Sequence, residues 1–200
     1  MHWMFVSFEG IDGSGKSSQA GLLVERLRGS DVEVVASREP GGTALGERVR
    51  ELLLGASHVT PWAEATLFAA ARAQLVAEVV VPALERGAWV VVDRFLDSSL
   101  AYQGGGRGLG VEAVFELNRV AIGDVLPDRT FLLQVPVESA LARIGVGRLD
   151  RIEAEGAEFL ETVAGEFERL AARFDRIQAI DGTRPENEIA EKIAGRLGLL

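Results

Sequence analysis

The sequence predicts an α/β fold in which a five-stranded parallel sheet is covered by helices on both faces, and three observations support it. Short apolar runs with strand character alternate along the chain with longer segments of helical apolar spacing. The first strand-like run passes through a glycine-rich loop into a helix-like segment. Hydrophobic residues make up 48% of the 200 residues, which excludes disorder and is enough to build a sizeable core. We therefore expect one domain over residues 1–200.

The predicted elements follow from the spacing of apolar residues. Strands are expected over residues 3–9, 33–37, 89–93, 130–135 and 177–180. Helices are expected over residues 16–28, 45–54, 61–86, 95–103, 111–122, 137–144, 154–174 and 185–197. Pro82 lacks an N–H group and is expected to kink or interrupt its helix, and the glycines of residues 104–108 predict a loop. Ligands of such sheets bind beyond the carboxyl ends of the strands, so the polar residues there are expected to form one site.

Residues 10–17, with the sequence GIDGSGKS, fit the phosphate-binding pattern G-x-x-x-x-G-K-[ST]. Glycines let successive backbone N–H groups turn toward phosphate oxygens, and the following helix directs its positive end at the same anion. Lys16 would reach the β- and γ-phosphates, and the Ser17 hydroxyl would bind Mg²⁺. Asp93 ends an apolar strand, which is the position of an acid that holds Mg²⁺ or its water, although a helix N-cap is an alternative.

Composition and charge exclude several classes of function. A formal net charge of −9 argues against a polymeric nucleic acid partner, since such proteins usually present a basic face. Without cysteine the chain has no disulfide and no thiol chemistry, which is compatible with the cytoplasm. The N-terminal residues lack the pattern of a signal peptide, and we expect no apolar run near the ~20 residues of a membrane span.

Four segments resemble motifs of the thymidylate kinases (dTMP kinases), in the order in which that family carries them. They are residues 8–19 around the glycine loop, Arg-Glu-Pro-Gly-Gly-Thr at 38–43, the segment 93–104 that begins Asp-Arg-Phe, and Arg-Leu-Asp-Arg at 148–151. The resemblance implies a P-loop nucleoside monophosphate kinase fold with a short lid at about 143–153. It also implies transfer of the γ-phosphoryl group of ATP to dTMP, giving dTDP, with Mg²⁺ as cofactor and a homodimer as the assembly.

The resemblance also assigns residue roles. It gives roles in phosphoryl transfer to Lys16, Arg94, Asp93, Arg148, Arg143, Asp12 and Glu39. It gives ATP contacts to Gly10, Ile11, Asp12, Gly13, Ser14, Gly15, Lys16, Ser17 and Ser18, with adenine near residues 181–184. It gives dTMP contacts to Asp12, Glu39, Arg50, Phe68, Arg72, Arg94, Ser99, Tyr102 and Gln103, and metal contacts to Ser17 and Asp93.

Among these residues, Phe68 matches the ring that stacks on thymine, and Arg72 the group that binds a thymine carbonyl. Ser99 and Gln103 match polar contacts to the base, and Tyr102 the ring that excludes ribonucleotides. Taken alone, Phe68 would more often be a core residue, and Arg50 a solvated helix arginine.

The family places its catalytic arginine either in the phosphate loop, at the position that Gly13 holds here, or in the lid. Gly13 therefore favours the lid type, for which Arg143, Arg148 and Arg151 are available. The alternative for these arginines is ion pairing with Glu153 and Glu155. Phe95 stands where the family usually has tyrosine, and Ser17-Ser18 where it has a threonine pair, and neither departure is expected to change the chemistry.

Two other classes of function remain as alternatives. A P-loop deoxynucleoside kinase would share the sheet and the loop but needs a general base, commonly a glutamate, to deprotonate a sugar hydroxyl. The arginine-rich acceptor side favours a phosphate acceptor, which is already ionised. A GTPase switch requires an Asn-Lys-x-Asp motif, and the two lysines of the chain, Lys16 and Lys192, do not lie in one.

Overall fold

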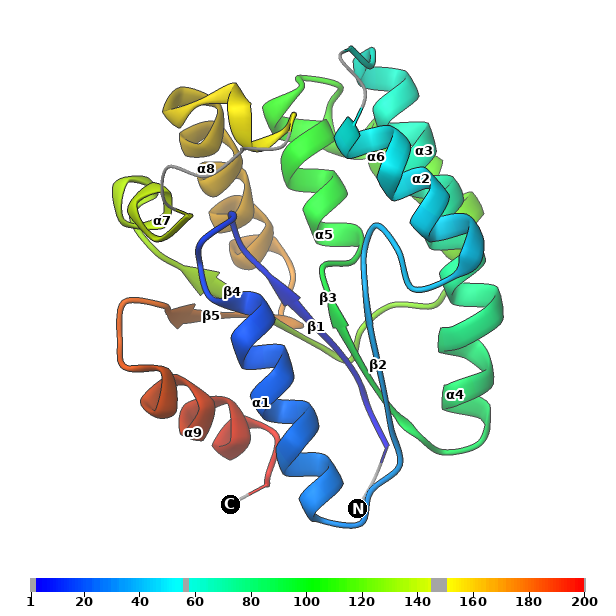
Figure 1. The fold of residues 1–200 in the computed structure, drawn as a ribbon, viewed down its shortest axis with the longest axis vertical. Helices are drawn as coiled ribbons and strands as arrows, with labels where there is room; N and C mark the ends of the chain where they lie inside the picture. Colours follow the sequence, from blue (N-terminus) through cyan, green and yellow to red (C-terminus); the bar gives the residue numbers. More distant parts are fainter. Residues whose placement is uncertain (1–2, 56–57, 145–150, 200) are drawn as a thin grey trace.

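The computed structural model describes residues 3–55, 58–144 and 151–199 and contains a five-stranded parallel sheet (Figure 1). The strands are β1 (Phe5–Glu9), β2 (Val34–Arg38), β3 (Trp89–Asp93), β4 (Arg129–Gln134) and β5 (Ile177–Asp181). Their order across the sheet is β2-β3-β1-β4-β5, and every neighbouring pair is parallel. The predicted five-stranded parallel sheet is thus confirmed. The strand order reverses at β1, so the crevice beyond the carboxyl ends of β1 and β3 is the expected ligand position.

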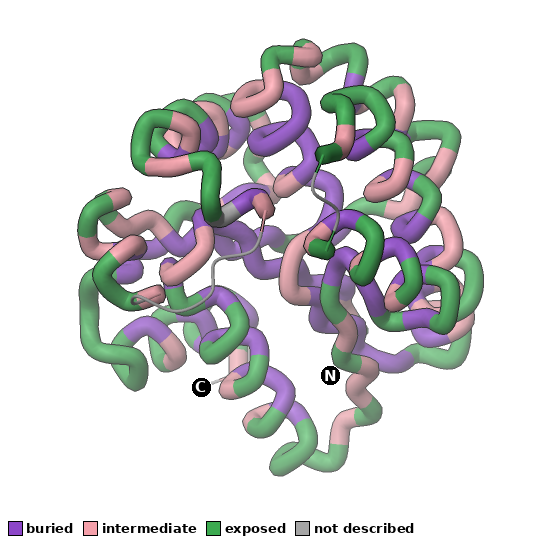
Figure 2. Tube along the Cα trace, turned by 45° about the horizontal axis from the view of Figure 1, so that its top comes forward, coloured by how far each residue is buried: buried purple, intermediate pink, exposed green. Residues whose placement is uncertain are grey.

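Helices cover both faces of the sheet. On one face α1 (Lys16–Gly29) and α9 (Glu186–Arg196) pack together, as Figure 1 shows. The other described helices are α2 (Ala44–Gly55), α3 (Pro61–Leu75), α4 (Val81–Glu85), α5 (Leu96–Ser99), α6 (Val111–Ile122), α7 (Val137–Ile144) and α8 (Ala157–Arg173). Strand β3 is apolar over its first four residues because alternate residues serve opposite faces: Val90 and Val92 join one core, and Trp89 and Val91 the other. Strands β1, β3 and β4 therefore lie largely buried between the helical layers, whereas the edge strand β2 is half-buried or exposed along its length (Figure 2).

The segment 61–85 stays helical throughout, but its α-helical pattern is interrupted just before Pro82. A π-helical turn, η1 (Val76–Val80), separates α3 from α4 there, which agrees with the expected kink or interruption. The stretch is also long and apolar enough to cross a membrane by length and composition, contrary to the expectation that no run would qualify. Core helices pass the same test, and α3 packs against α2 and α6 with Glu64 and Arg72 buried.

Glycines 104–106 belong to a helical segment, so the loop predicted at 104–108 is wrong for its first three residues. Helix α5 continues into the π-helical segment η2 (Leu100–Gly106). A Cβ atom at Gly105 would lie 2.8 Å from Glu166 Cγ, and one at Gly106 would lie 2.7 Å from the ring of Phe159. These glycines permit the close approach of α8 and do not mark a break in the helix. Helix α8 itself begins at Ala157, after Gly156 at φ +90°, later than expected.

Candidate active site

The phosphate-binding loop connects β1 to α1 at the centre of the sheet. Gly10, Gly13 and Gly15 have φ values of 140°, 77° and 95°, which favour glycine. No acidic residue occupies the first turn of α1, so its N-terminal N–H groups remain available to an anion. A cavity beside the loop is lined by residues 13–19 and by Arg143, Gly182, Arg184, Glu186 and Ile189. The loop thus opens toward the residues after β5, where the adenine contact is expected.

The predicted metal residues lie side by side at the end of β3. The Ser17 hydroxyl donates a hydrogen bond to Asp93 Oδ2, and Asp93 Oδ1 is buried without a partner among the described residues. The N-cap alternative for Asp93 is wrong, because the residue at the N-cap of α5 is Phe95. One hydroxyl and one carboxylate fit Mg²⁺, which commonly binds one or two carboxylates together with substrate phosphates and water.

Arg94 lies beside the phosphate loop, at the centre of a charged cluster. Its guanidinium donates to Asp12 Oδ1 at 2.6 Å, to the Gly10 carbonyl at 3.0 Å and to Tyr102 Oη at 3.3 Å. Lys16 Nζ donates to the same Asp12 oxygen at 3.1 Å. Burial favours neutral Asp12, but the charges of Arg94 and Lys16 outweigh it and hold the pKa of Asp12 far below its usual range. Asp12 is therefore an anion shared by two cations.

The backbone of Arg94 is held in an unusual conformation by Glu9. Arg94 has a φ of 68°, in the left-handed region that non-glycine residues rarely adopt. Glu9, fully buried, accepts a hydrogen bond from the next residue, Phe95 N, at 2.7 Å and another from Ser98 Oγ at 2.5 Å. Ser98 in turn accepts a bond from Arg94 at 2.9 Å. Burial, reinforced by the charge of Asp97, raises the pKa of Glu9 to about 8.

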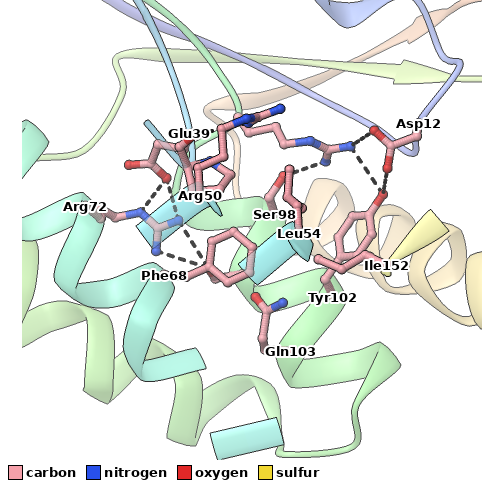
Figure 3. Close-up of a pocket in the computed structure, with 13 residues that line it drawn as sticks. Asp12, Glu39, Arg50, Leu54, Phe68, Arg72, Ser98, Tyr102, Gln103 and Ile152 are labelled. Carbon is pink, nitrogen blue, oxygen red and sulfur yellow. Dashed lines mark hydrogen bonds and ion pairs between the residues drawn. The ribbon is translucent and has the colours of Figure 1, made fainter. Parts of the chain in front are cut away.

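A second cavity, of about 570 Å³, lies beyond Arg94 between the sheet edge and helices α2, α3 and η2 (Figure 3). Every residue predicted to bind dTMP lines it: Asp12, Glu39, Arg50, Phe68, Arg72, Arg94, Ser99, Tyr102 and Gln103. The other lining residues are Pro40, Leu54, Ser98 and Ile152. The structure thus brings together residues from four separate parts of the sequence.

Arg72 forms the buried end of this cavity. It is 1% exposed and donates to Glu39 Oε2 from Nε at 2.8 Å and from Nη2 at 2.6 Å. Its remaining N–H groups donate to Ser99 Oγ, Asn118 Oδ1 and the Phe95 carbonyl. All five guanidinium donors therefore have protein partners, so an additional contact to a base requires one of them to be shared.

Arg50 and Phe68 line the cavity from α2 and α3. Arg50 is half-buried, donates to the Pro40 carbonyl at 3.1 Å and forms no ion pair with a described residue. Phe68 is also half-buried and packs against Val49 and Leu53 as well as facing the cavity. Its ring thus packs on the core and also lines the cavity, where Figure 3 shows it.

The arginines proposed for the lid do not share one set of contacts. Arg143, on α7, extends over the phosphate loop and donates to the carbonyls of Gly13 at 3.4 Å and Gly182 at 3.1 Å. Arg148 lies outside the described residues. Arg151 pairs with Glu64 at 2.6 Å, and Glu155 pairs with Arg107, so the expected alternative of a pair between Arg151 and Glu155 is wrong.

Gly13 cannot carry a side chain without moving α7. A Cβ atom there would lie 2.3 Å from the carbonyl oxygen of Ala140, which is closer than any real contact. The packing of α7 on the loop thus excludes an arginine at this position and favours Arg143 or Arg148 for the role.

Sequence reasoning missed four polar residues beside the site. Glu9 carried a usable signal, since it is an acid at the end of a largely apolar, buried strand. Ser98 lies inside the third family motif, but nothing in its residue type marks it. Glu64 and Asn118 are buried partners of the cavity residues Gln103 and Arg72, and their helical patterns give no sign of it.

Comparison with known proteins identifies the family. A sequence model of the thymidylate kinase family matches residues 8–193. The chain is 47% identical to thymidylate kinase of Thermosipho africanus, with 94% of each chain covered. It is 46% identical to thymidylate kinase of Pseudomonas fluorescens strain SBW25, with 100% of this chain and 97% of the relative covered. The crystal structure of thymidylate kinase from Ehrlichia chaffeensis superimposes with a TM-score of 0.82 at 34% identity, covering 99% of each chain. The chain belongs to the thymidylate kinase family.

Proposed function

We propose that this protein is a dTMP kinase that transfers the γ-phosphoryl group of ATP to dTMP, giving dTDP for dTTP synthesis. The observation that carries the proposal is the position of Arg94 and Asp12, which border both the phosphate loop and the 570 Å³ cavity. A donor phosphate and an acceptor phosphate can therefore meet at one guanidinium. The alternative of a deoxynucleoside kinase has no comparable support, because the similar proteins are named thymidylate kinases.

On the donor side, the loop N–H groups, the N-terminus of α1 and Lys16 are expected to hold the triphosphate of ATP. Lys16 is buried against Asp12, so binding requires it to exchange or share that carboxylate with phosphate oxygens. Ser17 and Asp93 are the residues that would hold Mg²⁺, as their adjacent oxygens suggest. The ion would neutralise phosphate charge and orient the β- and γ-phosphates.

In the transfer step, an oxygen of the dTMP phosphate forms a bond to the γ-phosphorus while the bond from that phosphorus to the β-bridging oxygen breaks, releasing ADP. The acceptor oxygen is already ionised, so no general base is needed. Arg94 would hold the acceptor phosphate in line, with Arg50 as a second cation, and Arg143 or Arg148 would reach the transferred group from the lid. Asp12 and Glu39 would orient Arg94 and Arg72, which they contact.

The base end of the cavity supports recognition of thymine. Phe68 offers a ring for stacking, and Gln103, Ser99 and Arg72 offer polar groups along the same cavity. Tyr102, whose hydroxyl contacts Asp12 at 3.2 Å, would close the space beside the sugar C2′ and disfavour ribonucleotides.

We further infer a single kinase domain with a lid at about 143–153, acting in the cytoplasm as a homodimer and without a nucleic acid partner. Exposed apolar side chains on neighbouring helices support a self-association face, namely Leu52 on α2, Trp62 on α3 and Val120 on α6. Val120 is 87% exposed. Val120→Glu is expected to shift the sedimentation coefficient from that of a dimer toward that of a monomer if this face is the interface.

An ADP-release assay tests the proposed reaction. The purified protein is given ATP and Mg²⁺ with dTMP, dUMP, dCMP, AMP or thymidine as acceptor. A strong preference for dTMP is the expected result. Turnover of thymidine without turnover of dTMP would replace the proposal with a deoxynucleoside kinase, and would remove the phosphate-binding roles of Arg94 and Arg50.

A further inference from the structure

Glu64 is a buried carboxylate beside the cavity, surrounded by donors from two separate parts of the sequence. It lies in α3 and is 1% exposed. Arg107 donates to both of its oxygens at 3.2 Å, Arg151 pairs with Oε2 at 2.6 Å, and Gln103 Nε2 donates to Oε1 at 2.9 Å. The arginines are themselves held in place, since Arg107 lies over the ring of Phe159 and Arg151 donates to a backbone carbonyl of α2. Glu64 is therefore fixed in position independently of any ligand.

The chemistry of this carboxylate determines how the Gln103 amide is turned. Burial favours the neutral acid, but hydrogen bonds from Arg107, Gln103 and Arg151 outweigh it and lower the pKa of Glu64. An ionised carboxylate accepts hydrogen bonds and donates none, so Gln103 must present its NH₂ group to Glu64. The Gln103 oxygen is then the amide atom left for a ligand, and it has no hydrogen-bond partner among the described residues.

Gln103 is in a position to use that oxygen. It is buried, lines the acceptor cavity, and extends from η2 toward Phe68 (Figure 3). Thymine and uracil carry an N–H donor at N3, whereas cytosine has a hydrogen-bond acceptor there. A Gln103 oxygen fixed at the Watson–Crick edge of the base would therefore accept a hydrogen bond from thymine or uracil. With cytosine it would face another acceptor, which repels it.

We propose that Glu64 is a positioning residue for base selectivity, which fixes the Gln103 amide with its oxygen toward the base and so makes the cavity reject cytosine. The proposal rests on the proposed placement of thymine between Phe68 and Gln103. Glu64 itself does not contact the substrate and acts through Gln103. Because a glutamine at position 64 both donates and accepts, it would allow the Gln103 amide to turn and present either group to the base.

The test compares the kcat/KM ratio for dTMP over dCMP in wild type and in Glu64→Gln. Leaving a polar group of a buried site unpaired commonly costs tenfold to a hundredfold in affinity, so the ratio is expected to fall by about that factor. Glu155→Gln is the matched control, since it removes the other carboxylate of Arg107 without touching Gln103. The control ratio should equal that of wild type.

Two further variants keep the outcome decisive. Glu64→Asp retains the charge but withdraws the carboxylate from Gln103, so it should also lower the ratio. It takes the place of Glu64→Gln if that variant does not fold. Gln103→Leu removes the amide and should lower the dTMP/dCMP ratio by the full tenfold to hundredfold.

Equal losses for dTMP and dCMP in Glu64→Gln, or an unchanged ratio in a folded Glu64 variant, would overturn the proposal and leave Glu64 a structural residue. If Gln103→Leu lowers the ratio while the Glu64 variants do not, only the role of Glu64 fails. If Gln103→Leu also leaves the ratio unchanged, the proposed base site fails with it.

Discussion

The contact between Gly13 and α7 can be tested by adding one methyl group. Gly13→Ala places a Cβ 2.3 Å from the Ala140 carbonyl oxygen, at a φ of 77°. Gly15→Ala is the matched control, because Gly15 has a φ of 95° in the same loop and a Cβ there would have no atom within 4 Å. Both variants carry the strain of a left-handed backbone, and only the first collides with a helix. The difference between them isolates the packing of α7 on the phosphate loop.

The expected magnitudes follow from those two effects. A left-handed backbone at a non-glycine residue lowers the free energy of unfolding by about 1–2 kcal/mol, and this applies to both variants. Forcing a methyl group against packed backbone lowers it by a further ~1–3 kcal/mol, and this applies only to Gly13→Ala. In a domain of this size each kcal/mol lowers the unfolding midpoint by about 2–4 °C. Gly13→Ala should therefore unfold roughly 2–12 °C below Gly15→Ala.

The assay is thermal unfolding of the nucleotide-free protein, followed by steady-state kinetics of the folded variants. Because α7 carries Arg143, displacement of the helix is also expected to lower kcat in Gly13→Ala. Equal unfolding midpoints for the two variants would show that the expected clash with Ala140 is absent. The packing of α7 would in that case no longer explain why an arginine is excluded from position 13.

Three other perturbations have definite expected results. Arg94→Lys loses the two guanidinium contacts to Asp12 and Gly10, so kcat/KM for dTMP should fall by about 10²–10³. The affinity for ATP, measured by fluorescence titration, should change little. An unchanged kcat/KM would exclude Arg94 from acceptor binding. Asp93→Asn removes the proposed metal charge beside Ser17, so kcat should fall and the Mg²⁺ concentration for half-maximal rate should rise; a magnesium dependence like that of wild type would remove Asp93 from the metal site. The pKa of Glu9 is raised to about 8 by burial and by Asp97, so the stability that the buried neutral acid contributes is fully present below the ordinary value of 4.5 and is lost as pH rises through 8. Glu9→Gln cannot ionise, and its unfolding midpoint should therefore fall less than that of wild type between pH 6 and 9; parallel curves would show that Glu9 does not titrate in this range.

Local patterns in the sequence were sufficient to predict most of the fold. The continuous apolar run of β3 and the helical spacing after the glycine loop report burial directly, because side-chain periodicity follows from backbone geometry. The glycines 104–106 misled the prediction, since a helical glycine can serve close packing. Whether such a residue ends a helix depends on neighbours distant in sequence.

The residues of the candidate site could be predicted only where they lie in a motif with a known chemical role. Lys16 and Asp93 lie in motifs whose residue types the phosphate and metal chemistry require. The partners that orient the cavity residues could not be predicted, because Glu64 and Asn118 occur in ordinary helical patterns and gain their roles from tertiary contacts. The saturation of the Arg72 donors likewise depends on partners that are distant from it in sequence.

The acceptor group of the reaction can be identified by ³¹P NMR of the product formed from ATP and Mg²⁺ with dTMP or with thymidine. We expect dTMP to be converted to dTDP, seen as a new pair of coupled α- and β-phosphorus doublets beside those of ADP, and we expect thymidine to give no new phosphate ester. Formation of a phosphomonoester from thymidine, with dTMP left unchanged, would show that a sugar hydroxyl is the acceptor and that the protein is not a dTMP kinase.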